Sequence, residues 1–351
     1  MIISLSLFTL LLTLTSLASL IRRDEWWIRI FDFPRLQLSI LIILAIIISL
    51  LLLNFSEIGH FLILLVLFGN LIFQGWRIYP YTIFAPITVK KFRGPATDNA
   101  ISILVSNVLT PNRKVYLLLK QIRKYQPDLV LTLESDQWWQ EKLSALSESY
   151  PYRINVPLDN LYGMHLFSKL SLEEQHVNYL IKPDIPSIEA LIKLRSGKLI
   201  KIYCLHPEPP SPTENDASTE RDAEILLTGK KMNAQNFPGL VFGDLNDVAW
   251  SKTTTLFQKT SHLMDPRKGR GFYSTYNAKY PFLRWPLDHI FHSSEFQLVQ
   301  IKRLSNIGSD HFPLFTKLQL SDNDQEGMQA TKKEKERADD KIAKVDSNQQ
   351  L

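Results

Sequence analysis

The stretch "NIGSDHFPLFTKL", residues 306–318, combines a polar triplet with a strand-like run. Its second half is rich in apolar and β-branched residues, as a buried strand is, whereas Ser309, Asp310 and His311 have no evident use in packing. Taken alone, the triplet is also compatible with a surface turn, because Asp and Ser are ordinary turn residues. A functional reading of the triplet therefore requires partners elsewhere in the chain.

Strand-like runs alternate with helical patterns between residues 98 and 319, which predicts an α/β domain. The segment 112–126 places its apolar residues on one helical face, and Pro127 follows as a stop. Catalytic groups of α/β scaffolds commonly lie at strand ends. Polar residues that strand packing does not require stand at the ends of most of these runs: Asn107, Glu134, His206, Asp244, Asn246, Asp288, Asp310 and His311.

The residue types in this set suit phosphoester chemistry with a hard cation. Oxygen ligands without cysteines favour Mg²⁺, with Mn²⁺ as an alternative, and the single Cys204 excludes a cysteine-rich zinc site. Asp288 can hold the ring of His311 so that the imidazole takes a proton from water. Hydrogen bonds to a phosphate are available from Asn107, His206 and Asn246.

The order of the motifs resembles a known family. The segments "SNVL", "LTLES", "YGMHLFSK", "LHPEPP", "GDLND", "RWPLDHIF" and "GSDHFPL" are similar to the successive motifs of the endonuclease/exonuclease/phosphatase superfamily, over residues 98–319. The apolar N-terminal region and the loop "WWIRIFDFPR" resemble a bacterial membrane-anchored branch of that superfamily. The resemblance implies a DNase I-like, four-layer αββα sandwich in which the motifs meet at one edge of two packed sheets.

The resemblance also implies which residues bind the metal and the substrate. Glu134 would be the main Mg²⁺ ligand, with Asp310 and Asn107 on the metal side. His206 would contact the scissile phosphate, and Asn107 and Asn246 would contribute further hydrogen bonds to the substrate.

The implied reaction is hydrolysis of a phosphoester by metal-assisted attack of water on phosphorus. Asp244 and Asn246 would orient the nucleophile and stabilise the transition state, and Asp288 would hold His311, the base. Nucleic acid and a lipid head group both remain open as substrates, because no residue identifies a base edge or an inositol ring. The alternative is a catalytically silent membrane module that binds a phosphorylated ligand or a partner.

The first quarter of the chain is strongly apolar. The segments 2–21, 38–55 and 59–76 are each about long enough to cross a bilayer, and none carries a polar stripe. They predict a membrane region over residues 1–78 with three transmembrane helices. The lipid bilayer is thus one expected partner, and no obligate protein partner is implied.

Basic residues indicate how the chain is oriented. Arginines occur in the loop 22–35 and basic residues recur after residue 76, whereas the turn between the second and third spans has none. The positive-inside rule then places the soluble domain on the cytoplasmic side of the inner (cell) membrane. We expect residues 79–97 to be a linker and the highly charged segment 320–351 to be disordered.

Overall fold

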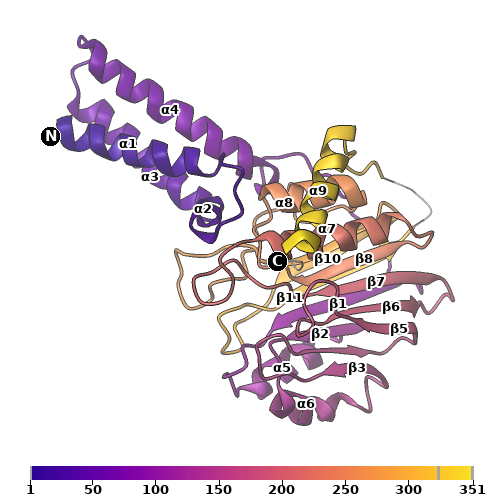
Figure 1. The fold of residues 1–351 in the computed structure, drawn as a ribbon. Helices are drawn as coiled ribbons and strands as arrows, with labels where there is room; N and C mark the ends of the chain where they lie inside the picture. The colour runs from indigo at the N-terminus through magenta and orange to yellow at the C-terminus, as the bar shows by residue number, and fades with distance from the viewer. Residues whose placement is uncertain (1, 322–324, 349–351) are drawn as a thin grey trace.

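Two mixed β-sheets form the centre of the protein in a computed structural model that describes residues 2–321 and 325–348 (Figure 1). The first sheet has the spatial order β10 (Phe296–Arg303), β11 (Leu314–Leu320), β1 (Ala100–Asn107), β2 (Leu129–Leu133), β4 (Met164–Ser168) and β3 (Tyr152–Val156). The second has the order β5 (Leu172–Asn178), β6 (Ser187–Lys193), β7 (Leu199–Leu205), β8 (Gly239–Asp244) and β9 (Asp288–His292). The pairs β1–β2 and β7–β8 are parallel, and the remaining pairs are antiparallel.

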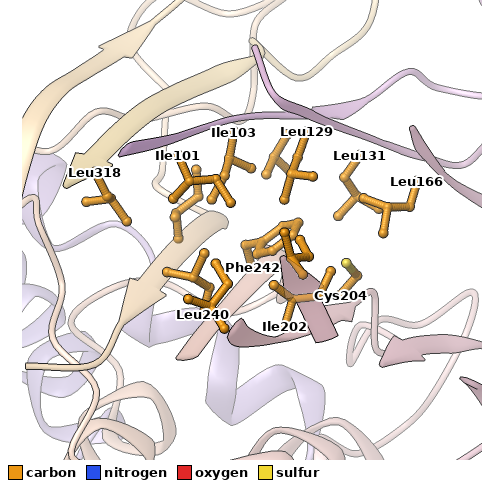
Figure 2. Packing of buried hydrophobic residues seen from close by; sticks show 14 of the residues in the cluster. Ile101, Ile103, Leu129, Leu131, Leu166, Ile202, Cys204, Leu240, Phe242 and Leu318 are labelled. Atoms are coloured by element: carbon orange, nitrogen blue, oxygen red, sulfur yellow. The ribbon is translucent and has the colours of Figure 1, made fainter. Parts of the chain in front are cut away.

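Side-chain alternation along the central strands explains why the two sheets stack. Ile101 and Ile103 of β1 belong to the core between the sheets, whereas Leu104 belongs to a second apolar cluster on the outer face. Both faces of such a strand are buried, which accounts for its nearly continuous apolar sequence. In Figure 2 the labelled side chains of the two sheets point toward one another: Ile101, Ile103, Leu129 and Leu131 from the first, and Ile202, Cys204, Leu240 and Phe242 from the second.

Helices cover the outer faces of both sheets. The outer cluster of the first sheet includes residues of α5 (Val115–Tyr125) and α6 (Gln137–Leu143), which is followed by the short η3 (Ser144–Leu146). The outer cluster of the second sheet includes residues of α7 (Thr219–Asn233) and α8 (Lys252–Ser261). The expected two-sheet α/β sandwich is therefore confirmed.

The N-terminal region is a helical bundle that extends away from the sandwich (Figure 1). Its elements are α1 (Ile2–Ala18), α2 (Trp26–Arg29), η1 (Ile30–Asp32), α3 (Arg35–Leu52), α4 (Ile58–Ile78) and η2 (Tyr79–Tyr81). Leu12, Ile42 and Leu67 join α1, α3 and α4 through one apolar cluster. The helical segments Arg35–Leu52 and Ile58–Tyr81 are long and apolar enough to span a membrane, and α1 is shorter. The count of three spans stays a prediction.

Two segments differ from their expected character. Residues 79–97 pack against the sandwich, because Tyr81 donates a hydrogen bond to the carbonyl of Ala249 at 2.6 Å and Val89 is buried in the core between the sheets. In the charged segment 320–351, residues Lys332–Asn348 form helix α9, which packs on α7 and α8. Its Ala338 contributes to the outer apolar cluster of the second sheet, which explains why a highly charged sequence is ordered there.

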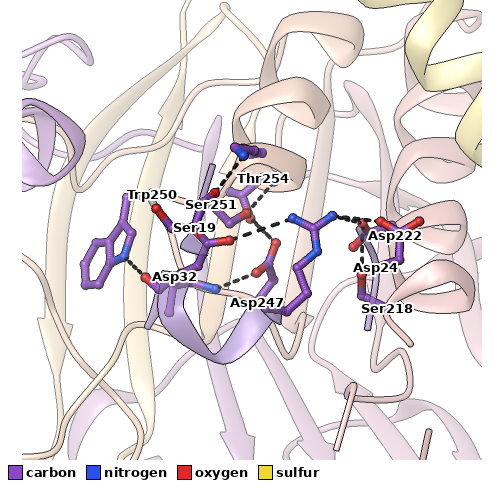
Figure 3. A network of polar contacts seen from close by, with 12 residues as sticks. Ser19, Asp24, Asp32, Ser218, Asp222, Asp247, Trp250, Ser251 and Thr254 are labelled. Carbon is purple, nitrogen blue, oxygen red and sulfur yellow. Dashed lines mark hydrogen bonds and ion pairs between the residues drawn. The ribbon is translucent and has the colours of Figure 1, made fainter. Parts of the chain in front are cut away.

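Buried ion pairs connect the loop before α3 to the sandwich and to α9. Arg29 donates to Asp24 at 2.9 Å and to Asp222 at 3.4 Å, and Lys341 of α9 bonds the same two carboxylates at 2.9 and 2.7 Å. Figure 3 shows the neighbouring contact, in which the Trp250 indole donates to the carbonyl of Asp32 at 2.7 Å. The apolar helices are thus held to the sandwich by charge pairs as well as by the chain itself.

We expect the substitution Asp222→Asn to destabilise the protein. Burial would raise the pKa of Asp222, but the charges of Lys341, Arg221 and Arg29 lower it well below its usual range. This contribution to the free energy of unfolding is therefore present at neutral pH and is lost as the pH falls through the lowered pKa. Breaking a buried pair costs about 3–5 kcal/mol. Thermal unfolding of the full-length protein in detergent should show a midpoint lower by about 6 °C or more.

Asp339→Asn is the matched control, because its partner Lys230 and Asp339 itself are about half exposed, at 52% and 56%. An exposed pair contributes little to stability, so this midpoint should hardly change. Equal shifts in the two variants would show that the buried network does not stabilise the protein.

Candidate active site

The predicted polar residues gather where three strands end and a fourth begins. Asn107 ends β1, Glu134 follows β2, Asp244 ends β8 and Asp288 begins β9. The pairing of β8 with β9 is antiparallel and sets Asp244 directly opposite Asp288, so the end of one strand meets the start of the other. The chain therefore brings residues far apart in sequence to one edge of the two sheets.

Asp244 lies at the centre of this group. Its Oδ2 accepts a hydrogen bond from Asn107 Nδ2 at 3.2 Å and lies 3.4 Å from His311 Nε2. His206 Nε2 is also close to this oxygen, at 4.0 Å, while Oδ1 accepts from the backbone N–H of Asn246 at 3.0 Å. Burial raises the pKa of Asp244, and the positive charge of His311 opposes that rise. One buried carboxylate thus contacts most of the predicted site.

His311 is held between two carboxylates. Its Nδ1 is 2.8 Å from Asp288 Oδ2, and Tyr276 packs on the ring with centroids 4.9 Å apart. Burial alone would lower the pKa of His311, but Asp244, Asp288 and Asp310 outweigh it and raise the pKa to about 10. In the metal-free protein the ring is therefore an imidazolium at neutral pH.

Glu134 is coupled to Asp244 through Asn107. Asn107 Nδ2 donates to Glu134 Oε1 at 2.7 Å as well as to Asp244, while its Oδ1 accepts from the backbone N–H of Leu109 at 3.1 Å. Burial raises the pKa of Glu134 to about 7. Asn107 therefore acts in this geometry as a donor that links two carboxylates.

The backbone at the strand ends adopts conformations that bring these groups together. Leu109, Glu134 and Asn246 have φ angles of 61°, 54° and 50°, the left-handed region that costs free energy for residues other than glycine. Gly243 precedes Asp244, and a Cβ atom there would lie 1.9 Å from the carbonyl oxygen of Leu205. The glycine of "GDLND" is needed for β7 and β8 to approach so closely.

A cleft of about 410 Å³ opens at this edge of the sheets. It is lined by Glu134, His206, Asn246, Asp310 and His311 among others. Asn246 is fixed by its Nδ2, which donates to the carbonyl of Pro207 at 2.9 Å. Burial lowers the pKa of His206 to about 4, so this imidazole is neutral at pH 7. All eight predicted residues lie at the cleft or bond to a residue that does.

The donor set fits a divalent cation. Ligand atoms of Asp244, Asp288 and His311 lie within 4.8 Å of one another. The second carboxylate oxygen of Asp288, Oδ1, is buried and has no hydrogen-bond partner among the described residues. Glu134 and Asp310 add carboxylates at the cleft wall. Several carboxylates crowded together with few compensating charges are the environment that a hard cation stabilises.

The site also contains residues that the sequence analysis did not identify. Tyr276 covers His311, and buried Arg267 donates to the carbonyl of Asp288 at 3.1 Å. Tyr162 and Glu214 form a hydrogen-bonded pair in the cleft wall. Phe33, from the loop that precedes α3, lines the same cleft. These residues lie in loops without periodicity, so only the three-dimensional fold identifies them.

The structure is thus a two-sheet α/β sandwich in which two carboxylates and an imidazole, from Asp244, Asp288 and His311, group at the strand ends. The sequence profile described as "Endonuclease/Exonuclease/phosphatase family" matches residues 104–311, more than half of the chain. The chain belongs to this family, whose members are phosphoester hydrolases such as nucleases and phosphodiesterases. The superfamily resemblance of the motifs is thereby confirmed, and the membrane-anchored branch stays a prediction. No curated protein matches the chain.

Solved structures with the same fold include the human Nocturnin catalytic domain with a bound sulfate anion, at 17% identity and a TM-score of 0.53, covering 65% of this chain and 97% of that one. A humanized D. rerio TDP2 matches at 15% identity and a TM-score of 0.51, covering 63% and 99%. A family protein from Bacteroides thetaiotaomicron matches at 18% and 0.51, covering 65% and 100%. At these identities the likeness shows the fold alone.

We expect His311 to remain protonated at pH 8 in the metal-free protein. In the variant Asp244→Asn its pKa should fall by about 1–3, because the negative charge that raises it most is removed. Histidine NMR titration of the full-length protein in detergent with a chelator measures both values. His206 is the internal reference and should stay neutral from pH 6 upward. If His311 is neutral at pH 7 without metal, the surrounding carboxylates do not raise its pKa as we expect.

Proposed function

We propose that the protein is a membrane-anchored phosphoester hydrolase that depends on Mg²⁺ or Mn²⁺ and has phosphodiesterase or nuclease-like chemistry. The grouping of Asp244, Asp288 and His311 within 4.8 Å, beside the cleft wall formed by Glu134 and Asp310, carries the proposal. Family membership supplies the reaction class.

Glu134 and Asp310 are the residues that would hold the cation at the cleft. When bound there, a divalent ion supplies positive charge that polarises a phosphoryl oxygen and offsets developing negative charge. Asn107 positions Glu134 and Asp244 through its amide group, since its Oδ1 accepts from Leu109. We therefore propose that Asn107 positions the two carboxylates and contacts the substrate through the same amide group. We prefer these roles to direct ligation of the metal.

His311 is the proposed base. Asp288 holds Nδ1, which leaves Nε2 facing Asp244, where a water molecule oriented by Asp244 and Asn246 would lose its proton. The same carboxylates keep the ring protonated in the metal-free protein, so the base is available only when their field is offset. His206, neutral because it is buried, is suited to hydrogen-bond the scissile phosphate.

The exposed faces of the N-terminal helices support membrane anchoring. Ile43, Ile47 and Leu51 of α3 are 43%, 47% and 76% exposed, which is unfavourable in water and favourable in lipid. The loop 22–35 contacts the sandwich through the bond from Arg29 to Asp222 and through the carbonyl of Asp32, which accepts from Trp250. The loop and the sandwich therefore lie on the same side of any bilayer that the helices cross. We propose a membrane region over 1–78, a hydrolase domain over 98–319, and a cytoplasmic location for that domain at the inner membrane.

The variant Asp288→Asn should lose at least about 100-fold in kcat for a generic phosphodiester, bis(p-nitrophenyl) phosphate, because the amide has no negative charge to stabilise the imidazolium that forms when His311 takes the proton. The assay uses the full-length protein in detergent with Mg²⁺, and a chelator arm should abolish turnover. Asp98→Asn, an exposed carboxylate away from the cleft, is the control and should retain the rate. Circular dichroism confirms that the variants are folded.

An unchanged rate in Asp288→Asn would remove the Asp288–His311 pair from the mechanism. A folded protein that binds Mg²⁺ but turns over no phosphoester, whether DNA, RNA, phospholipid or a generic diester, would favour the alternative, a silent module that binds a phosphorylated ligand.

A reporter fused after Leu351 should behave as cytoplasmic in a bacterial host. This expectation follows from the basic residues in the loop 22–35 and after residue 76. Paired fusions of alkaline phosphatase and green fluorescent protein measure it, with a fusion in the short turn at Ser56 as the opposite control. A periplasmic signal from the C-terminal fusion would overturn the proposed orientation.

A further inference from the structure

A second groove, of about 590 Å³, lies between the first turn of α3 and the sandwich. Leu36 and Gln37 of α3 form one wall, and the chain near Phe282 forms another. All the charged residues that line the groove are basic: Arg270, Arg284, Lys302 and Arg303. The proposed hydrolase site does not include this groove.

The basic residues of the groove lack counter-charges. Among the described residues, none of the four makes an ion pair with a carboxylate. The guanidinium groups of Arg284 and Arg303 both pack on the ring of Phe312, at 5.0 and 4.5 Å from its centroid. Burial lowers the pKa of Arg303, and the charge of Arg284 lowers it further. Arg284 and Arg303 donate to the backbone carbonyls of Tyr280 and Ser274, at 3.1 and 2.7 Å, and a bound anion would offset the repulsion between the two positive charges.

The groove lies where lipid head groups would meet the protein. Gln37 Nε2 donates to the carbonyl of Phe282 at 2.8 Å, which fixes the loop beside the start of the apolar helix α3. That loop presents Tyr280, Phe282 and Leu283 to solvent, with Phe282 85% exposed. Exposed aromatic and aliphatic side chains beside arginines match the interface of a bilayer, where apolar groups enter the membrane and cations stay at the head groups.

We propose that this groove binds the head group of an anionic phospholipid in the leaflet where α3 begins. The proposal rests on the membrane anchoring proposed above. Arg284 and Arg303 would bond the lipid phosphate, since guanidinium groups suit phosphate oxygens in a bidentate geometry. The acyl chains would lie along the exposed apolar face of α3. A single-stranded nucleic acid would stack bases on Tyr280 and Phe282, but the position of the groove beside the start of the apolar helix α3 favours the lipid.

The groove is separate from the hydrolase cleft but adjoins it. Tyr276 and Trp285 pair with ring centroids 6.2 Å apart, and Tyr276 packs on His311 on the cleft side. Ser274 and Arg284, close to these two residues in the chain, line the groove. Phe312, on whose ring Arg284 and Arg303 pack, directly follows His311 in the chain. A bound lipid would hold the mouth of the cleft at the level of the head groups.

The test measures lipid retention by native mass spectrometry of the full-length protein in mild detergent. Phosphatidylglycerol and phosphatidylcholine are supplied in equal amounts. We expect phosphatidylglycerol to be retained about 10-fold better, and the double variant Arg284→Gln/Arg303→Gln to lose about 10-fold of that retention. Lys302→Gln, which removes one exposed cation from the groove lining, should lose a smaller part.

Lys142→Gln/Arg153→Gln is the matched control, because it removes two exposed cations, one in α6 and one in β3. Figure 1 shows these two elements far from the N-terminal helices α1, α3 and α4. It should retain phosphatidylglycerol as the unchanged protein does. Equal retention of the two lipids, or unchanged retention in both groove variants, would overturn the proposal. Displacement of the lipid by an equal concentration of inorganic phosphate, or arginine-dependent binding of a single-stranded oligonucleotide in place of lipid, would also overturn it.

The variant His311→Ala separates this proposal from the proposed function. It should lose hydrolysis and keep phosphatidylglycerol, because His311 does not line the groove. If the unchanged protein retains lipid through these arginines but shows no hydrolase activity, the result would count against the proposed function alone.

Discussion

The dry core between the two sheets is the constraint on which the rest of the structure depends. Because β1 and β8 are buried on both faces, a charged side chain can be accommodated only where a strand ends. The sheets place the ends of β1, β2 and β8 beside the start of β9, so the polar residues of distant motifs meet at one edge. Asp244 and His311 are there buried enough to influence each other strongly, which is why their protonation cannot be treated separately.

The second constraint is the attachment of the apolar helices to the sandwich. Arg29 and Arg35 count as free positive charges in a reading of the sequence, yet in the structure they bond Asp24 and Asp32 in buried pairs. This attachment also places Phe33 in the cleft wall, so a residue of the N-terminal helical region lines the candidate site. The N-terminal helices and the cleft are therefore structurally connected, and a change in the loop 22–35 can alter the cleft wall through Phe33.

The sequence predicted those parts of the fold whose local pattern is unambiguous. The long apolar runs of β1, β2, β7 and β8 were readable because both of their faces are buried, and the polar residues at their ends identified the site. The strand β5, with its polar sequence "LEEQHVN", lies at a sheet edge and has no such pattern. Tyr276 and Arg267 were missed because loop residues lack periodicity. Helix α9 was expected to be disordered, since its charges appear solvated until the fold supplies Asp24 and Asp222 as partners.

The contact between Lys341 and Asp24 has a consequence for biosynthesis. The two residues are separated by 317 positions, and they share a buried cluster with Asp222. Asp24 leaves the ribosome 317 residues before Lys341, so this cluster stays incomplete while the residues between them are synthesised. The N-terminal helices and both sheets are therefore synthesised before this cluster can form. A chain that lacks α9 would keep Asp24 and Asp222 without their lysine partner, and Arg29 would be the cation that still bonds both carboxylates.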